Sequence, residues 1–108
     1  MKLLKYKGYI GNIQVSIEDD VLHGKLLYIS ALVTYEGHSV DEVKVSFEEA
    51  VDDYLETCKE KGYQPEVPCK GSFNIRIGHD LHLAATVKAK EMEISLNEFV
   101  TESISNRL

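Results

Sequence analysis

The first part of the chain shows an alternation of apolar and polar positions. Ile13, Val15 and Ile17 alternate with polar residues, which is the period-two pattern of a half-buried strand. Residues 22–27 and 28–35 are rich in aliphatic and aromatic side chains and predict two more strands. We therefore expect a small sheet before residue 36.

A helix is predicted over the segment that follows. Ser39 and Glu42 form a Ser-x-x-Glu capping box, in which each side chain satisfies a free backbone N–H group near the helix start. Apolar residues then recur at spacings of three and four and share one helix face: Val40, Val43, Phe47, Ala50, Val51, Tyr54, Leu55 and Cys58. Gly62 supplies a left-handed residue that ends the helix. The order β-β-β-α predicts an α+β domain with the helix packed on an antiparallel sheet.

Both prolines lie in one short segment, Gln64-Pro-Glu-Val-Pro-Cys-Lys70. Because residues before proline avoid the helical region, this segment, residues 64–70, is expected to be an extended linker. It would separate a first domain, residues 1–63, from a second domain, residues 71–108.

The second domain opens with one short predicted strand between Gly71 and Gly78. Alternation divides its side chains between two faces. The apolar face consists of Phe73, Ile75 and Ile77, and the polar face consists of Ser72, Asn74 and Arg76.

Two helices are predicted after this strand. The first carries apolar residues at helical spacing, namely Leu81, Ala84, Ala85, Ala89 and Met92. The second begins at Ser95, which forms another capping box with Glu98, and Ile94 and Phe99 are placed for a hydrophobic staple. One strand and two helices leave backbone hydrogen bonds unmade and bury too small a core.

A two-fold dimer would solve both problems, because the strand would pair with its copy and four helices would surround it. We expect the dimer core to contain Phe73, Ile75, Ile77 and Phe99. The polar face of such a ribbon fits the major groove, where Asn can bind adenine and Arg can bind guanine. Free N–H groups at the start of the second helix, around Leu96 and Asn97, would hold a phosphate.

Charge is distributed unevenly along the chain. Residues 1–69 contain 7 Lys and 13 Asp or Glu, a net charge of −6, whereas residues 70–108 contain 5 basic and 5 acidic residues. An acidic surface repels nucleic acid and suits a basic protein partner. DNA binding by the second domain would therefore depend on local geometry. No run of about 18 apolar residues occurs, and the basic start lacks the apolar stretch of a signal peptide, so we expect a cytosolic protein.

The residues that could bind metal are few. Cys58 and Cys69 are too few for a disulfide framework or a zinc site and are expected to be reduced, partly buried thiols. His79 and His82 are three residues apart, but no third ligand is evident nearby, so we expect a surface or capping role. We expect no metal and no cofactor.

Several stretches resemble the HicB family, along nearly the whole chain: Lys7-Gly-Tyr9, Tyr35-Glu-Gly-His-Ser-Val40, Phe47-Glu-Glu-Ala-Val-Asp-Asp-Tyr-Leu55 and Leu81-His82. The resemblance implies a degenerate RNase H-like first domain followed by a ribbon-helix-helix domain. Members of the family typically act as antitoxins that bind HicA, a small basic ribonuclease with a double-stranded-RNA-binding-like fold. They also repress the operon that encodes the pair.

The stretch Ser72-Phe-Asn-Ile-Arg76 followed by Ser95-Leu-Asn97 is similar to ribbon-helix-helix repressors of the Arc/MetJ type. By position, Ser72, Asn74 and Arg76 would read bases, and Ser95, Leu96 and Asn97 would contact phosphate. That family often has a glycine between the two helices, where this chain has Glu93 or Ile94. A left-handed conformation there would cost a non-glycine residue ~1 kcal/mol.

Enzymatic activity is not expected. RNase H-type chemistry needs several carboxylates that converge on two metal ions about 4 Å apart, whereas Asp19 and Asp20 are turn residues. The acids on the polar helix face have the right sign to contact a basic toxin instead: Glu48, Glu49, Asp52 and Asp53.

Three functions remain as hypotheses. The first is an antitoxin and autorepressor that binds a HicA-like toxin and operator DNA as a homodimer, with tetramers left open. The second is an orphan repressor whose first domain senses a ligand or mediates oligomerisation. The third is a divalent-metal ribonuclease.

Overall fold

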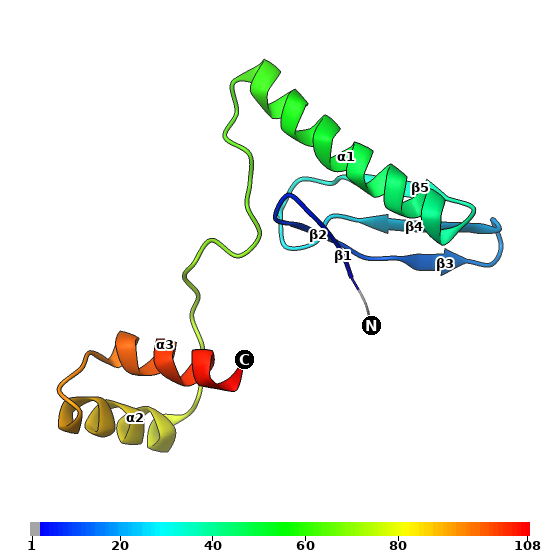
Figure 1. Cartoon of the computed structure of the whole chain (residues 1–108). Helices are drawn as coiled ribbons and strands as arrows, with labels where there is room; N and C mark the ends of the chain where they lie inside the picture. The colour runs from blue at the N-terminus through cyan, green and yellow to red at the C-terminus, as the bar shows by residue number, and fades with distance from the viewer. Residues whose placement is uncertain (1–2) are drawn as a thin grey trace. The chain divides into compact units, whose positions relative to one another are not determined.

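The computed structural model describes residues 3–108 and shows an α+β protein (Figure 1). Its contacts divide it into a unit that ends at Ser72 and a second unit, Phe73–Leu108. Over the described residues, the strands are β1 (Leu4–Tyr6), β2 (Tyr9–Gly11), β3 (Gln14–Ser16), β4 (Val21–Lys25) and β5 (Thr34–Gly37), and the helices are α1 (Val40–Lys61), α2 (His79–Glu91) and α3 (Leu96–Arg107). None of these helices is both long enough and apolar enough to cross a membrane.

The strands of the first unit form two small antiparallel sheets. β1 and β2 form a hairpin, and β3, β4 and β5 form a meander in that order. The hairpin turn consists of Lys7 and Gly8, both with positive φ (50° and 83°), as the favoured two-residue hairpin turns require. The two sheets adjoin, because the Leu27 N–H group donates to the Ile10 carbonyl at 2.8 Å.

Helix α1 begins and ends where the sequence predicts. The Ser39 hydroxyl accepts a hydrogen bond from the Glu42 N–H group at 3.1 Å, while the Glu42 carboxylate reaches back to the His38 N–H group at 2.6 Å. At the other end Gly62 has a φ of 71°, and the Tyr63 N–H group donates to the Cys58 carbonyl at 2.8 Å. These bonds satisfy backbone groups that a helix end leaves free.

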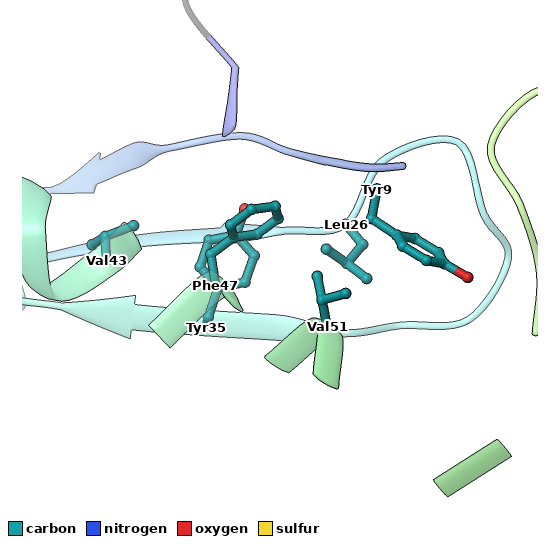
Figure 2. Close-up of a cluster of buried hydrophobic side chains, with 6 residues drawn as sticks. All are labelled: Tyr9, Leu26, Tyr35, Val43, Phe47 and Val51. Atoms are coloured by element: carbon teal, nitrogen blue, oxygen red, sulfur yellow. The ribbon is translucent and has the colours of Figure 1, made fainter. Parts of the chain in front are cut away.

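The core of the first unit lies between α1 and the strands (Figure 2). Val43, Phe47 and Val51 from α1 are fully buried, and the Phe47 ring meets the Tyr35 ring edge-on with centroids 5.3 Å apart. Gly11 makes this packing possible, because a Cβ atom there would lie 2.7 Å from the Phe47 ring. The apolar residues at helical spacing on α1 thus pack against the strands, where Gly11 leaves room for the Phe47 ring.

Burial along residues 13–17 does not follow the alternation that the sequence predicts. Ile13 packs against the core, but Val15 and Ile17 are 66% and 89% exposed. The predicted strand is confirmed as β3, but its predicted burial was wrong because β3 is the edge strand of its sheet, whereas α1 packs on β1, β4 and β5. Val40 is also exposed, at the first turn of α1.

The predicted order of three strands was also incomplete. β1 and β2 precede the first expected strand, and the expected strand at 28–35 is a connection up to residue 33, followed by β5. Tyr28 has a φ of 64°, a left-handed conformation that a continuing strand does not allow. A short aromatic and aliphatic run therefore forms a loop.

In the second unit α2 and α3 pack against each other. The turn between them places Glu93 in the left-handed region, with a φ of 59°. The Ile94 N–H group donates to the Ala89 carbonyl at 3.0 Å, and the Glu93 N–H group donates to the Lys90 carbonyl at 3.1 Å, the two bonds of a Schellman motif. Glu93, and not Ile94, therefore takes the place where a glycine would be favoured.

Candidate functional site

Every residue of the segment expected to read DNA is exposed in the single chain. Residues 71–78 lie in no strand of the described structure, and they run between Gly71 and Gly78, which have φ values of 94° and 84°. Base readout was predicted for Ser72, Asn74 and Arg76, and all three are exposed. These side chains are therefore accessible on an extended segment whose backbone has no partner strand within residues 3–108.

The second unit exposes an unusual share of its apolar side chains. Among residues 73–108 only Ala85 and Ala89 are buried. Large apolar residues are exposed along the segment and both helices: Phe73, Ile75, Ile77, Leu81, Leu83, Val87, Met92 and Ile104. Of the expected dimer core, Phe99 alone is half-buried. Two buried alanines and a few half-buried apolar residues form a small core for a unit of this size.

The start of α3 presents backbone donors. The Ser95 hydroxyl accepts a hydrogen bond from the Glu98 N–H group at 3.0 Å, so half of the predicted capping box is formed. Leu96 and Asn97 are the first residues of the helix, and N–H groups at these positions have no acceptor within a helix. Because the Ser95 side chain caps the helix, Leu96 and Asn97 are the better candidates for phosphate contact.

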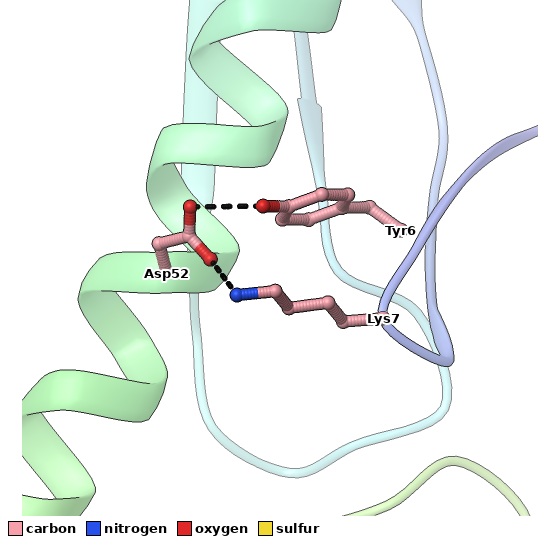
Figure 3. A network of polar contacts seen from close by, with 3 residues as sticks. All are labelled: Tyr6, Lys7 and Asp52. Carbon is pink, nitrogen blue, oxygen red and sulfur yellow. Dashed lines mark hydrogen bonds and ion pairs between the residues drawn. The ribbon is translucent and has the colours of Figure 1, made fainter.

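The acidic face of α1 was expected to contact a partner, and its residues Glu48, Glu49, Asp52 and Asp53 are exposed. Asp52 already has partners within the unit (Figure 3): it accepts from the Lys7 ammonium at 2.8 Å and from the Tyr6 hydroxyl at 3.1 Å. The Lys7 hydrogen bond holds the pKa of Asp52 below its usual value, and Asp52 raises the pKa of Lys7. Glu48, Glu49 and Asp53 remain the better candidates for external contact.

A residue that sequence reasoning missed fixes the predicted linker to the first unit. The Glu66 carboxylate accepts hydrogen bonds from the Ser30 N–H group (2.8 Å), the Ser30 hydroxyl (2.6 Å) and the Ala31 N–H group (2.9 Å). The Ser30 hydroxyl, with the two N–H groups, holds the pKa of Glu66 below its ordinary value. An acidic residue between two prolines was the only signal in the sequence.

The backbone of Glu66 is held as well. Its N–H group donates to the Tyr54 hydroxyl at 3.0 Å, and its carbonyl accepts from the Tyr9 hydroxyl at 2.5 Å. The segment 64–70 is therefore not a free linker along its whole length, because its middle is bonded to β2, to α1 and to the connection before β5.

The candidate metal and thiol residues are dispersed. His79 and His82 are exposed, and residues 3–108 contain no group of three or more His, Cys, Asp or Glu side chains that could hold a metal ion. Cys58 is buried, while Cys69 is exposed, contrary to the expectation of partial burial. Burial raises the pKa of Tyr35 to about 12, which suits a structural hydroxyl that donates to the Asn12 carbonyl.

Comparison with known proteins gives one match. Residues 54–104, from the last turns of α1 to most of α3, match the model of the HicB family, which is just under half of the chain. No curated protein and no solved structure gives a significant match. HicB is a family of antitoxins and not of enzymes. Residues 54–104 of this chain are therefore similar to the HicB family.

Proposed function

We propose that this chain is the antitoxin of a HicA/HicB-type toxin-antitoxin system. It binds and neutralises a small basic ribonuclease, and it represses its own operon as a ribbon-helix-helix dimer. The observation that carries the proposal is the second unit, an unpaired segment followed by two helices whose large apolar residues are mostly exposed. The family match covers this unit up to residue 104.

Dimerisation would make the DNA-binding surface. Pairing residues 72–77 with their copy would satisfy the exposed backbone and would cover Phe73, Ile75 and Ile77 with helices from both chains. The opposite face of the ribbon would then present Asn74 and Arg76 to base edges in the major groove. The second unit carries no excess of positive charge, so specificity would come from these contacts and from the N-terminus of α3.

The first unit would bind the toxin. We propose that its strands and α1 form a degenerate RNase H-like domain that has lost catalysis. Its negative charge suits a basic protein and would speed encounter with it.

An orphan repressor is the second candidate, and one observation favours it. The first unit has an open hollow of about 550 Å³ lined mainly by polar residues of the meander, among them Ser16, His23 and Glu36. A small polar ligand bound there would make this unit a sensor.

The decisive experiment is a pull-down of the tagged chain from its native cells, with bound protein and bound DNA both identified. We expect a small basic ribonuclease-like protein that is toxic when expressed alone, together with the promoter of the chain's own operon. Promoter DNA without a protein partner would favour the orphan repressor. If neither a protein partner nor promoter DNA is recovered, the ribbon assignment is wrong. The Arg76→Ala variant is the matched control, because it should release the promoter and keep the protein partner.

A further inference from the structure

The connection between β4 and β5, residues 27–33, displays two large apolar side chains and is called the knuckle below. Tyr28 is 62% exposed and Leu32 is 79% exposed. Single exposed apolar residues are ordinary on a protein surface. An exposed tyrosine is different, because tyrosine is enriched among the residues that anchor protein interfaces, and an exposed leucine on the same connection adds apolar area that a partner could bury.

The backbone of the knuckle is held in a costly shape. Tyr28 has a φ of 64°, and a left-handed conformation costs a residue with a side chain roughly 1–2 kcal/mol. A glycine would avoid this cost. Strained residues of this type persist only where the surroundings hold them, and they gather at binding and catalytic sites. The strain at Tyr28 therefore indicates a binding role for its exposed side chain.

Hydrogen bonds to Glu66 fix the backbone of the knuckle. Its carboxylate binds the Ser30 N–H group, the Ser30 hydroxyl and the Ala31 N–H group, all within 2.9 Å. Glu66 is itself fixed by Tyr54 of α1 and Tyr9 of β2. The loop between Tyr28 and Leu32 is thus shaped in advance by the core of the unit. A preformed surface spares the cost of ordering a loop on binding.

Residues 27–33 contain no charged side chain, so the charge of the surrounding domain favours one class of partner. Residues 1–69 carry a net charge of −6, so a second copy of the unit would bring like charges together, whereas a basic protein would be attracted. We propose that the knuckle is a docking surface for the basic protein partner, with Tyr28 and Leu32 as apolar anchors and Glu66 as a positioning residue. This inference rests on the proposed antitoxin function, since the basic partner is its toxin.

The test measures binding of the full-length chain to the small basic protein encoded beside it, by titration calorimetry. Tyr28→Asn keeps a residue that tolerates the left-handed conformation, and Leu32→Ser removes the second anchor. Each variant should bind more weakly and raise the dissociation constant about 30-fold or more, the loss typical of an interface anchor. Ile17→Ser is the matched control, because Ile17 is 89% exposed outside the knuckle, and it should bind like the wild-type chain.

The role of Glu66 is tested by a double-mutant cycle. Glu66→Gln places an amide N–H₂ group where the Ser30 and Ala31 donors need an acceptor, so it should weaken binding about 10-fold. If Glu66 acts by positioning the knuckle, adding Glu66→Gln to Tyr28→Asn should cost little more than Tyr28→Asn alone. Fully additive losses would show that Glu66 does not act through the knuckle.

The outcomes separate this inference from the proposed function. If the wild-type chain binds the basic protein and both knuckle variants bind it equally well, the docking surface is wrong and the antitoxin function stands. If the wild-type chain binds no basic protein, both fail. If the knuckle variants lose only self-association in sedimentation, the surface contacts a second copy and the proposal is overturned. A cooperative thermal transition of the first unit, retained in each knuckle variant, shows that the fold around the knuckle is intact.

Discussion

Glu93 occupies the left-handed position between α2 and α3, where its φ is 59°. Its side chain makes this conformation costly by roughly 1–2 kcal/mol, while glycine adopts it freely but loses more entropy on folding. We expect Glu93→Gly to raise the free energy of unfolding by up to ~1 kcal/mol, measured by urea denaturation at fixed protein concentration. Glu91→Gly, within α2, should lower the free energy instead. A loss in both variants would contradict the left-handed turn.

Arg76 is the residue on which sequence-specific binding depends most directly. As a bidentate ligand of guanine, Arg76 would contribute ~1–3 kcal/mol of discrimination. We expect Arg76→Ala to weaken operator binding by that amount and to relax the preference at one base pair, measured by fluorescence anisotropy on a set of single-base operator variants. An equal loss on every sequence would assign Arg76 to the phosphate backbone. Arg107→Ala, at the last turn of α3, should leave the base preference unchanged.

At the level of elements, the helices were predicted well because their signals are local. The ends of α1 lie at the predicted caps Ser39 and Gly62, and α3 begins after Ser95, whose side chain accepts from the Glu98 N–H group. Capping hydrogen bonds join residues within one turn, so a short stretch of sequence is enough to predict them. The strands were predicted less well. β1 and β2 have three residues each, too few for a periodic pattern, and burial of Val15 depends on whether a helix far along the chain covers its strand.

For the candidate site, too, local patterns support a prediction and long-range contacts cannot be predicted. Alternation alone predicts that Asn74 and Arg76 share one face, and this stays a prediction because residues 71–78 form no strand in the described chain. Glu66 was not identified, because its partners Ser30 and Ala31 are about 35 residues away in sequence. The bonds from Lys7 and Tyr6 to Asp52 also span more than 40 residues. Contacts of this range depend on the tertiary fold, and no local pattern of charges predicts them.

The contact of Glu66 with the knuckle should make the first unit sensitive to acid. The pKa of Glu66 is lowered from its ordinary value of 4.5, so the stability it contributes is present above that value and is lost as the pH falls through the lowered pKa. We expect Glu66→Gln to be less stable than the wild-type chain at pH 7, and the gap in urea midpoint to close as the pH falls below 4.5 through the lowered pKa of Glu66. Asp53→Asn, on the exposed face of α1, should show no such gap. A gap that persists in acid would contradict the hydrogen bonds made by the ionised carboxylate.

For the whole molecule, the two units differ in what holds them together. The first unit encloses its own core of Tyr9, Leu26, Tyr35 and three residues of α1, whereas residues 73–108 bury only Ala85 and Ala89 in the described chain. We therefore predict that the first unit folds alone and that the second folds only with a copy of itself. The net charge of −6 arises in residues 1–69, whereas residues 70–108 contain equal numbers of acidic and basic residues.

This difference predicts two unfolding transitions with different dependence on protein concentration. Unfolding of the second unit releases two chains, so each tenfold rise in concentration should stabilise it by about 1.4 kcal/mol, while the first transition should not move. Calorimetry from about 5 to 500 µM, with sedimentation to count chains, would measure both effects. Ile75→Ser should abolish the second transition and leave the first in place, because Ile75 lies on the predicted apolar face of the ribbon. If both transitions are independent of concentration, the second unit folds as a monomer, and a ribbon shared between two chains cannot be its DNA-binding surface.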